Sequence, residues 1–282
     1  MPHLTILIAT SFQRTTWLIK RSLPSVYRQE GIDGRKVAVL IVDDNEAAAE
    51  FDCLCKKVSA LRSELNLSEE DFPTRVMRNG RTRFMSGTGA WNTGIEEAFR
   101  LNPNGFVSIL DDDDEYLPHH LADCLTAAEG QTVAVFQRLY WKNWDDSDMH
   151  LPLTEASLTP ENFFVGNPGV QGSNMFFRTS CLVNIGGFDE TLPNTTDRDL
   201  MIRFLWEVQK QKESGWIVRV LENIGVVHYN HDREKVNSNL IRKQQGLDLF
   251  YQKYRYAFSS EAYRDSVARA RALFKYQPIE ER

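Results

Sequence analysis

Four consecutive aspartates, Asp111 to Asp114, directly follow the apolar run 106–110. Like charges this close together repel one another unless a cation or solvent screens them. Hard divalent cations such as Mg²⁺ and Mn²⁺ prefer oxygen ligands, and proteins commonly bind them together with the phosphates of a substrate. A strand that ends in aspartates therefore suggests a metal-phosphate site. The alternative is a solvated acidic loop, which is the usual role of a charge run.

Two further predicted strands, 4–9 and 37–42, also end in polar residues, namely Thr10 and Asp43 with Asp44. Apolar residues at helical spacing predict helices over 16–29, 46–65 and 90–101, between and after these strands. Continuous apolar strands that alternate with helices are typical of a mostly parallel sheet with helices on both faces. Because ligands bind beyond the carboxyl ends of such strands, we expect the three polar clusters to share one edge.

The second half of the chain is less regular. The pattern predicts strands at 132–141, 173–178 and 216–221, with 226–228 beginning or ending another, and helices at 117–129 and 197–212. Glycines and prolines over 159–172 predict a loop or crossover. We expect one domain, with its core in residues 1–240 and a helical extension of the same domain in 241–282.

Bulk properties exclude several classes of protein. The formal net charge of −6 over 282 residues argues against a nucleic-acid binder. The four cysteines include no C-x-x-C pair, so we expect neither a zinc knuckle nor a disulfide framework, and we favour a reducing, cytoplasmic compartment. We find no signal peptide and no apolar run of about 18 residues. Peripheral membrane association stays open.

In their order along the chain, several segments resemble the motifs of family 2 of the inverting nucleotide-sugar glycosyltransferases, which adopt the GT-A fold. The resemblance extends from residue 4 to about 239 and implies an α/β, Rossmann-like central sheet flanked by helices, with C-terminal helices. Trp91 stands where the family has an arginine, and Thr196 where it has a glutamate. The matching segments are 8–14, 42–46, 90–94, 110–114 with Pro118, 186–190, and the pair Thr196 and Asp197.

The resemblance implies roles for the residues that would bind the nucleotide. Thr10, Phe12 and Asp44, or its neighbour Asp43, would hold the base, and Arg83 would contact base or phosphate. From the residues alone, the two aspartates could instead cap the helix that follows them.

The resemblance also implies a metal site. Asp111, Asp112 and Asp113 would form the metal-ribose motif, with Asp113 as the direct ligand of Mn²⁺ or Mg²⁺. His228 or His231 would lie near the metal and the diphosphate. We favour His231, because the sequence Tyr-Asn-His around it is closer to the family's Tyr-Arg-x-His.

Asp197 would be the general base, with Asp199 as second choice. Without the family order, the favoured role of Asp197 is a capping or first-turn acid of the helix that it opens.

The predicted function is therefore metal-dependent transfer of a sugar, of the hexosyl type, from a nucleotide diphosphate sugar to an acceptor hydroxyl with inversion. We favour a UDP-sugar over a GDP- or dTDP-sugar, and a carbohydrate or another hydroxyl-bearing acceptor. Two alternatives stay open. A nucleotidyltransferase would usually carry a glycine-rich basic loop after its first strand, and residues 10–14 contain no glycine. A binding module without catalysis would account for the departures at Trp91 and Thr196.

Overall fold

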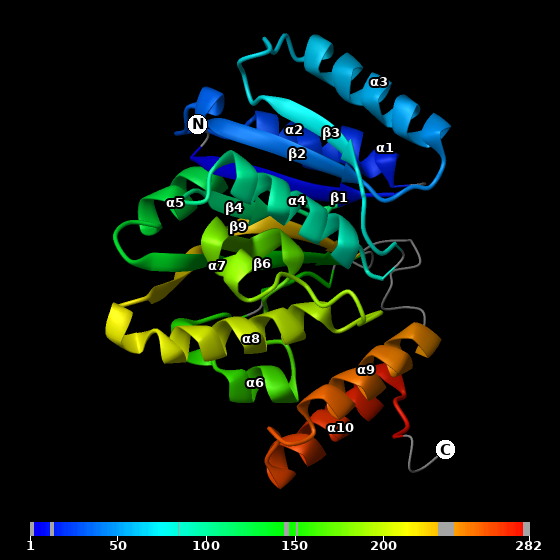
Figure 1. Cartoon of the computed structure of the whole chain (residues 1–282), viewed down its shortest axis with the longest axis vertical. Helices are drawn as coiled ribbons and strands as arrows, with labels where there is room; N and C mark the ends of the chain where they lie inside the picture. The colour runs from blue at the N-terminus through cyan, green and yellow to red at the C-terminus, as the bar shows by residue number, and fades with distance from the viewer. Residues whose placement is uncertain are drawn as a thin grey trace.

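The computed structural model describes residues 3–11, 14–83, 85–143, 147–150, 152–230 and 240–278. Nine strands form one sheet in the order β3-β2-β1-β4-β8-β6-β9-β5, with β7 paired to β6 (Figure 1). Helices cover both faces of this sheet, as the alternation of strands and helices predicts, so the α/β fold is confirmed.

The first half of the sheet is parallel. Its strands are β1 (Leu4–Thr10), β2 (Val37–Asp43), β3 (Thr74–Arg78) and β4 (Phe106–Ile109). Every residue of β2 is buried, which explains its continuous run of apolar side chains. Thr10 lies opposite Asp43 in the register of β1 and β2, so these polar ends meet.

The second half of the sheet is mixed. Strand β8 (Met175–Arg178) is antiparallel to β4 and to β6 (Thr132–Asn143), whereas β9 (Ile217–Asn230) is parallel to β6. Parallel pairing is therefore less general than the sequence suggested, and 216–221 and 226–228 belong to the single strand β9. Two short strands complete the sheet: β5 (Glu115–Tyr116) pairs with β9, and β7 (Met149–His150) pairs with β6.

One face of the sheet carries the helices that follow β1, β2 and the aspartates. Apolar side chains from these helices and from alternate strand positions form one core cluster on this face. The helices are α1 (Thr15–Trp17), which continues through a π-helical turn (Leu18–Ser22) into α2 (Leu23–Tyr27), α3 (Ala48–Glu64) and α5 (His120–Ala127).

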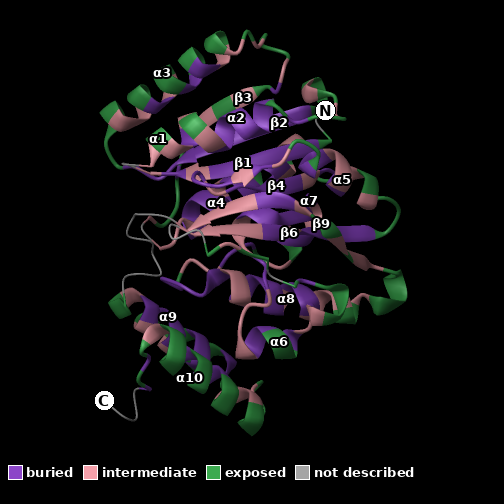
Figure 2. Ribbon diagram, turned by 180° about the vertical axis from the view of Figure 1, so that it is seen from behind, coloured by how far each residue is buried: buried purple, intermediate pink, exposed green. Residues whose placement is uncertain are grey.

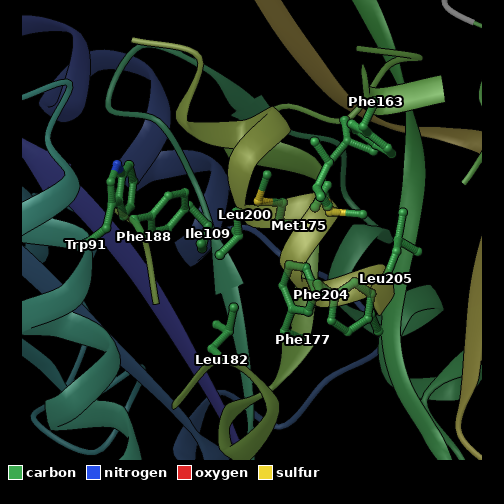
Figure 3. Close-up of a cluster of buried hydrophobic side chains, with 14 of the residues drawn as sticks. Trp91, Ile109, Phe163, Met175, Phe177, Leu182, Phe188, Leu200, Phe204 and Leu205 are labelled. Atoms are coloured by element: carbon green, nitrogen blue, oxygen red, sulfur yellow. The ribbon is translucent and has the colours of Figure 1, made fainter. Parts of the chain in front are cut away.

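The other face carries a second core cluster, part of which is shown in Figure 3. Its helices are α4 (Thr88–Leu101), α6 (Pro160–Val165), α7 (Thr179–Asn184) and α8 (Thr196–Lys210). Helix α6 lies within the segment 159–172 that we expected to be a loop or crossover. The Thr159 side chain accepts from Asn162 N, and Pro160 occupies the first turn, so this short helix has the start signals of a longer one.

The two C-terminal helices, α9 (Leu240–Tyr254) and α10 (Ser260–Phe274), lie at the end of the molecule opposite α3 (Figure 1). Their buried faces (Figure 2) add Leu247, Phe250, Tyr254 and Val267 to the same core cluster as α6 and α8. No helix in the described parts of the chain is long and apolar enough to cross a membrane. Short 3-10 turns lie at Gly34–Lys36, Glu155–Ser157, Gly172–Asn174 and Lys212–Ser214.

Candidate active site

The polar ends of β1 and β2 meet at the carboxyl edge of the sheet, as predicted. Asp44 N donates to Thr10 O at 2.8 Å, and Asn79 Nδ2 donates to Asp44 Oδ1 at 2.6 Å. Arg83 Nη2 donates in turn to Asn79 O at 2.7 Å. Thr10, Asp43, Asp44 and Arg83 are thus linked within one edge of the sheet. Phe12, the fifth residue expected to bind the nucleotide, lies outside the described residues.

Several polar atoms at this edge are buried without a hydrogen-bond partner. Among the described residues these are Thr10 Oγ1, Asp43 Oδ2, Arg83 Nε and Asp112 Oδ2. Buried polar groups are almost always satisfied in folded proteins, so each exception needs an explanation. Four such atoms on adjoining segments indicate a surface shaped to contact a polar ligand.

Arg14 holds the middle of the aspartate run. Its Nε donates to Asp112 Oδ1 at 2.6 Å, and its Nη2 lies 3.1 Å from Asp113 Oδ1. Burial raises the pKa of Asp112, and the guanidinium of Arg14 offsets only part of that rise. Thr10 also helps to lower this pKa, although its hydroxyl forms no hydrogen bond of normal geometry. No role was expected for Arg14, which the structure places beside the acidic run.

Asp114 connects the aspartate run to the second half of the sheet. Its Oδ2 accepts from Ser173 Oγ at 2.5 Å and lies 2.8 Å from His228 Nδ1, and its Oδ1 accepts from Tyr229 N at 3.1 Å. Burial alone would raise the pKa of Asp114, but His228 and these hydrogen bonds outweigh it and leave the pKa below its ordinary value. Asp114 is therefore ionised, and its contacts with His228 and Tyr229 hold the end of β9 in place.

Asp111, Asp114 and His228 each place a ligand atom within 4.8 Å of the other two. Burial raises the pKa of Asp111 to about 8, and repulsion from Asp114 and Asp113 adds to this rise. A cation at this point would relieve that repulsion, and carboxylates suit Mn²⁺ and Mg²⁺. The residues present therefore fit a divalent metal.

This group differs from the ligand set expected from the sequence. Asp113, expected as the direct ligand, has its carboxylate turned toward Arg14. His228 lies in the group, whereas His231, the favoured histidine, lies outside the described residues. Gly172 lies close to this group, since a Cβ there would lie 3.1 Å from Asp111 Oδ1.

Asp197 lies in the first turn of α8. Its carboxylate makes no hydrogen bond or ion pair with any residue that the structure describes. Burial raises the pKa of Asp197 to about 6, and the nearby charges of Lys243 and His228 limit that rise. An acid of this pKa can accept a proton near neutral pH. The N-cap of α8 is Thr195, whose side chain makes no cap bond, and Asp197 is one of two acids in the first turn.

Asp199, the second choice for the base, is fully engaged. Its Oδ2 accepts from Arg203 Nη2 at 2.7 Å, and its Oδ1 accepts from Lys253 Nζ at 2.5 Å and from Tyr254 Oη at 2.7 Å. Asp199 is completely buried and links α8 to α9. These contacts indicate a structural role and make Asp199 less suited than Asp197 to accept a proton.

The family's other motifs contribute to packing here. Trp91 is buried with its ring near that of Phe188, at 6.4 Å between centroids (Figure 3). Asn92 Nδ2 donates to Phe188 O at 2.9 Å, and Phe188 N donates to Asn92 Oδ1 at 2.8 Å. Arg81 forms ion pairs with Glu96 and with Glu190, at 2.8 Å from the latter. Arg81 is therefore paired with two glutamates, whereas Arg83 belongs to the polar edge described above.

Solved structures of glycosyltransferases share this fold. Residues 1–349 of S. aureus TarS, in complex with UDP-GlcNAc, match with a TM-score of 0.66 at 16% identity, covering 98% of this chain and 74% of that one. The mannosyltransferase PcManGT from Pyrobaculum calidifontis, in complex with GDP-Man and Mn²⁺, matches with a TM-score of 0.58 at 14% identity, covering 99% and 77%. At this identity the likeness shows the fold alone.

A model of the family described as glycosyl transferase family 2 matches residues 8–185. The match includes the ends of β1 and β2 and the whole aspartate run, whereas Asp197 and His228 follow it. No curated protein matches the sequence. The family model covers more than half of the chain and agrees with the order of motifs and with the GT-A fold, and the chain therefore belongs to glycosyl transferase family 2.

Proposed function

We propose that this glycosyltransferase moves a sugar from a nucleoside diphosphate sugar to an acceptor hydroxyl with inversion, assisted by a divalent metal. The observation that carries the proposal is the gathering of unpartnered buried atoms of Thr10, Asp43, Arg83 and Asp112 at one edge of the sheet. A nucleotide offers donors, acceptors and phosphate charge that would satisfy atoms of each of these kinds.

The donor would lie along this edge. Asp43, Asp44 and the Thr10 hydroxyl would contact the base, Arg83 the base or a phosphate, and Asp112 the ribose. TarS and the mannosyltransferase are described with UDP-GlcNAc and with GDP-Man, respectively, which supports a nucleotide sugar without choosing the base. We favour a UDP-sugar as donor.

The metal would be held by Asp111, Asp114 and His228, with Asp113 available if its carboxylate leaves Arg14. When bound, Mn²⁺ or Mg²⁺ would act as a Lewis acid that stabilises the charge developing on the leaving diphosphate. The contact of His228 Nδ1 with Asp114 Oδ2 would help to fix the orientation of the imidazole ring.

Asp197 would be the general base. It takes the proton from the acceptor hydroxyl as the hydroxyl oxygen attacks the anomeric carbon, and the bond from that carbon to the diphosphate breaks. A single displacement of this kind inverts the configuration of the sugar. With a pKa of about 6, raised by burial, Asp197 is ionised at pH 7 and above.

Donor binding and product configuration test this proposal. A thermal-shift series with UDP, GDP and dTDP, each with and without Mn²⁺, should show a metal-dependent rise with one base, because a ligand of the native state raises apparent stability. NMR of the transferred sugar should then show inverted configuration. Retained configuration would overturn the inverting mechanism. Binding of a nucleotide sugar without turnover on any acceptor or on water would favour the binding module.

A further inference from the structure

Helix α9 places a buried lysine beside the turn that carries the proposed base. Only 7% of Lys243 is exposed, and its Nζ donates to Asn194 Oδ1 at 2.7 Å. The ammonium also lies 4.4 Å from the centre of the Phe274 ring in α10. We propose that Lys243 is a positioning residue, which holds the turn 194–197 and thereby keeps the Asp197 carboxylate in its reactive place. This inference rests on the proposed role of Asp197.

Contacts lead from Lys243 to Asp197 through adjoining residues. Asn194 Oδ1, which accepts from Lys243, also accepts from Thr195 N at 2.7 Å. Thr195 is the N-cap of α8, and Asp197 follows in the first turn. Asn194 therefore connects Lys243 to the N-cap of α8, two residues before Asp197.

The turn needs such support because its backbone is strained. Thr195 has a φ of 68°, in the left-handed region that a β-branched residue rarely adopts. Its Oγ1 is buried without a hydrogen-bond partner in the described structure. A strained conformation of this kind persists only where the surroundings hold it, and such strain is concentrated at functional sites.

Helix α9 also fits the turn sterically. Gly246, one turn after Lys243, faces Asn194 so closely that a Cβ there would lie 2.8 Å from Asn194 Cβ and 3.1 Å from its backbone N and O. The absence of a side chain at Gly246 thus allows the close approach of α9 that lets the lysine reach Asn194. Two independent features of α9 therefore act on the same residue.

The charges agree with this arrangement. Burial lowers the pKa of Lys243 to about 7, helped by Arg198, whereas Asp197 raises it. In return, Lys243 lowers the pKa of Asp197, and His228 on β9 does so to a smaller extent. Lysines are almost never fully buried unless they are paired, and Asp197 supplies the opposite charge near Lys243.

Kinetics of matched variants test the proposal. Lys243→Met should lower kcat about tenfold or more, while the Kd of the donor changes less than twofold. The reason is that the lysine acts on the general base, Asp197, and not on the polar edge of the sheet where the nucleotide would bind. Lys243→Arg should restore part of kcat. The acidic limb of the kcat profile should also move to higher pH in Lys243→Met, because Asp197 loses the cation that lowers its pKa. Arg264→Met, at an exposed position of α10, should behave like the wild type.

A double variant separates positioning through Asp197 from a general defect. If Lys243 acts through Asp197, adding Lys243→Met to Asp197→Asn should not slow the residual reaction further. An additional loss as large as in the wild-type background would overturn the proposal. So would wild-type kcat in Lys243→Met.

Hydrogen exchange provides a readout that needs no activity. The Thr195 amide donates to Asn194 Oδ1, so its exchange should become about tenfold faster in Lys243→Met and in Gly246→Ala, and stay unchanged in Arg264→Met. Unchanged exchange in Lys243→Met would refute the idea that the lysine holds the turn. Full transfer by Asp197→Asn would instead refute the proposed base, and the exchange result would still decide the role of Lys243.

Discussion

Replacing Lys243 by methionine should stabilise this protein while it slows the reaction. Methionine has a similar length and no charge, so it fills the same space among Asn194, Phe274 and the core of α9. The substitution removes a buried ammonium that the folded state holds at an energetic cost. Few mutations stabilise a fold, which makes this outcome a demanding one.

The size of the effect follows from the pKa of Lys243, which burial lowers from 10.5 to about 7. At about 1.36 kcal/mol per pKa unit, this shift corresponds to roughly 5 kcal/mol against folding at pH 6, as an upper value. The pKa of about 7 already includes the attraction to Asp197, so only the lost hydrogen bond to Asn194, about 1 kcal/mol, and partial solvent screening are subtracted from that upper value. We expect a net gain in the free energy of unfolding of roughly 2–3 kcal/mol, or about 5 °C in Tm.

The pH dependence gives the effect its signature. The unfolded chain binds more protons at Lys243 than the folded one between pH 7 and pH 10.5, so the stability of the wild type rises with pH over that window. Lys243→Met lacks this rise. Its advantage should therefore be largest below pH 7 and should shrink as the pH approaches 10.5.

Thermal unfolding of the wild type, Lys243→Met and the surface control Arg264→Met at several pH values measures this directly. The control should match the wild type throughout. A lower Tm of Lys243→Met at pH 6, or a difference from the wild type that does not change with pH, would refute the reasoning about the buried charge.

Three further perturbations have defined outcomes. Activity should fall below about pH 6 as Asp197 becomes protonated, because burial raises its pKa to that value; a pH profile of kcat that is flat down to pH 4.5 would contradict this. Arg14→Met leaves the buried carboxylate of Asp112 without its counter-ion and should lower the free energy of unfolding by roughly 3 kcal/mol. Denaturant unfolding of Arg14→Met with and without Mn²⁺ should show that the metal restores part of this lost stability. A midpoint of Arg14→Met equal to that of the wild type would argue against the pairing of Arg14 with Asp112. In Gly187→Ala, the new Cβ would lie 2.3 Å from Asn92 Oδ1, and the residue would have to adopt a φ of 63°. The substitution should therefore lower the free energy of unfolding by about 2 kcal/mol or more in the same assay. A stability equal to that of the wild type would refute this close contact.

Local patterns account for what the sequence could predict. Strands β1, β2 and β4 are continuous apolar runs that end in polar residues, and their parallel pairing then brings Thr10, Asp43 and Asp111 to one edge. Each of these signals lies within about ten residues of chain. The alternation of strands and helices predicted the parallel pairing itself, because parallel strands must be joined by long crossover connections, which are usually helices.

Contacts between distant segments could not be predicted in the same way. Asp114 meets Ser173 and His228 because β8 and β9 join the sheet beyond β4, and no local pattern specifies that order. The group that could hold a metal, Asp111, Asp114 and His228, therefore joins distant segments, whereas the resemblance to the family implied Asp113 as the direct ligand. Lys243 reads locally as a cation on an amphipathic helix, and only the docking of α9 on the turn 194–197 buries it.

The central claim is that Asp197 removes the proton from the acceptor at a nucleotide-sugar site on the carboxyl edge of the sheet. Release of nucleoside diphosphate by the wild type and by Asp197→Asn, with Mn²⁺ and UDP-GlcNAc or GDP-Man, tests it most directly. We predict that Asp197→Asn binds the donor as tightly as the wild type and releases diphosphate at least about 100-fold more slowly. Equal rates for the two proteins at equal donor binding would contradict the account.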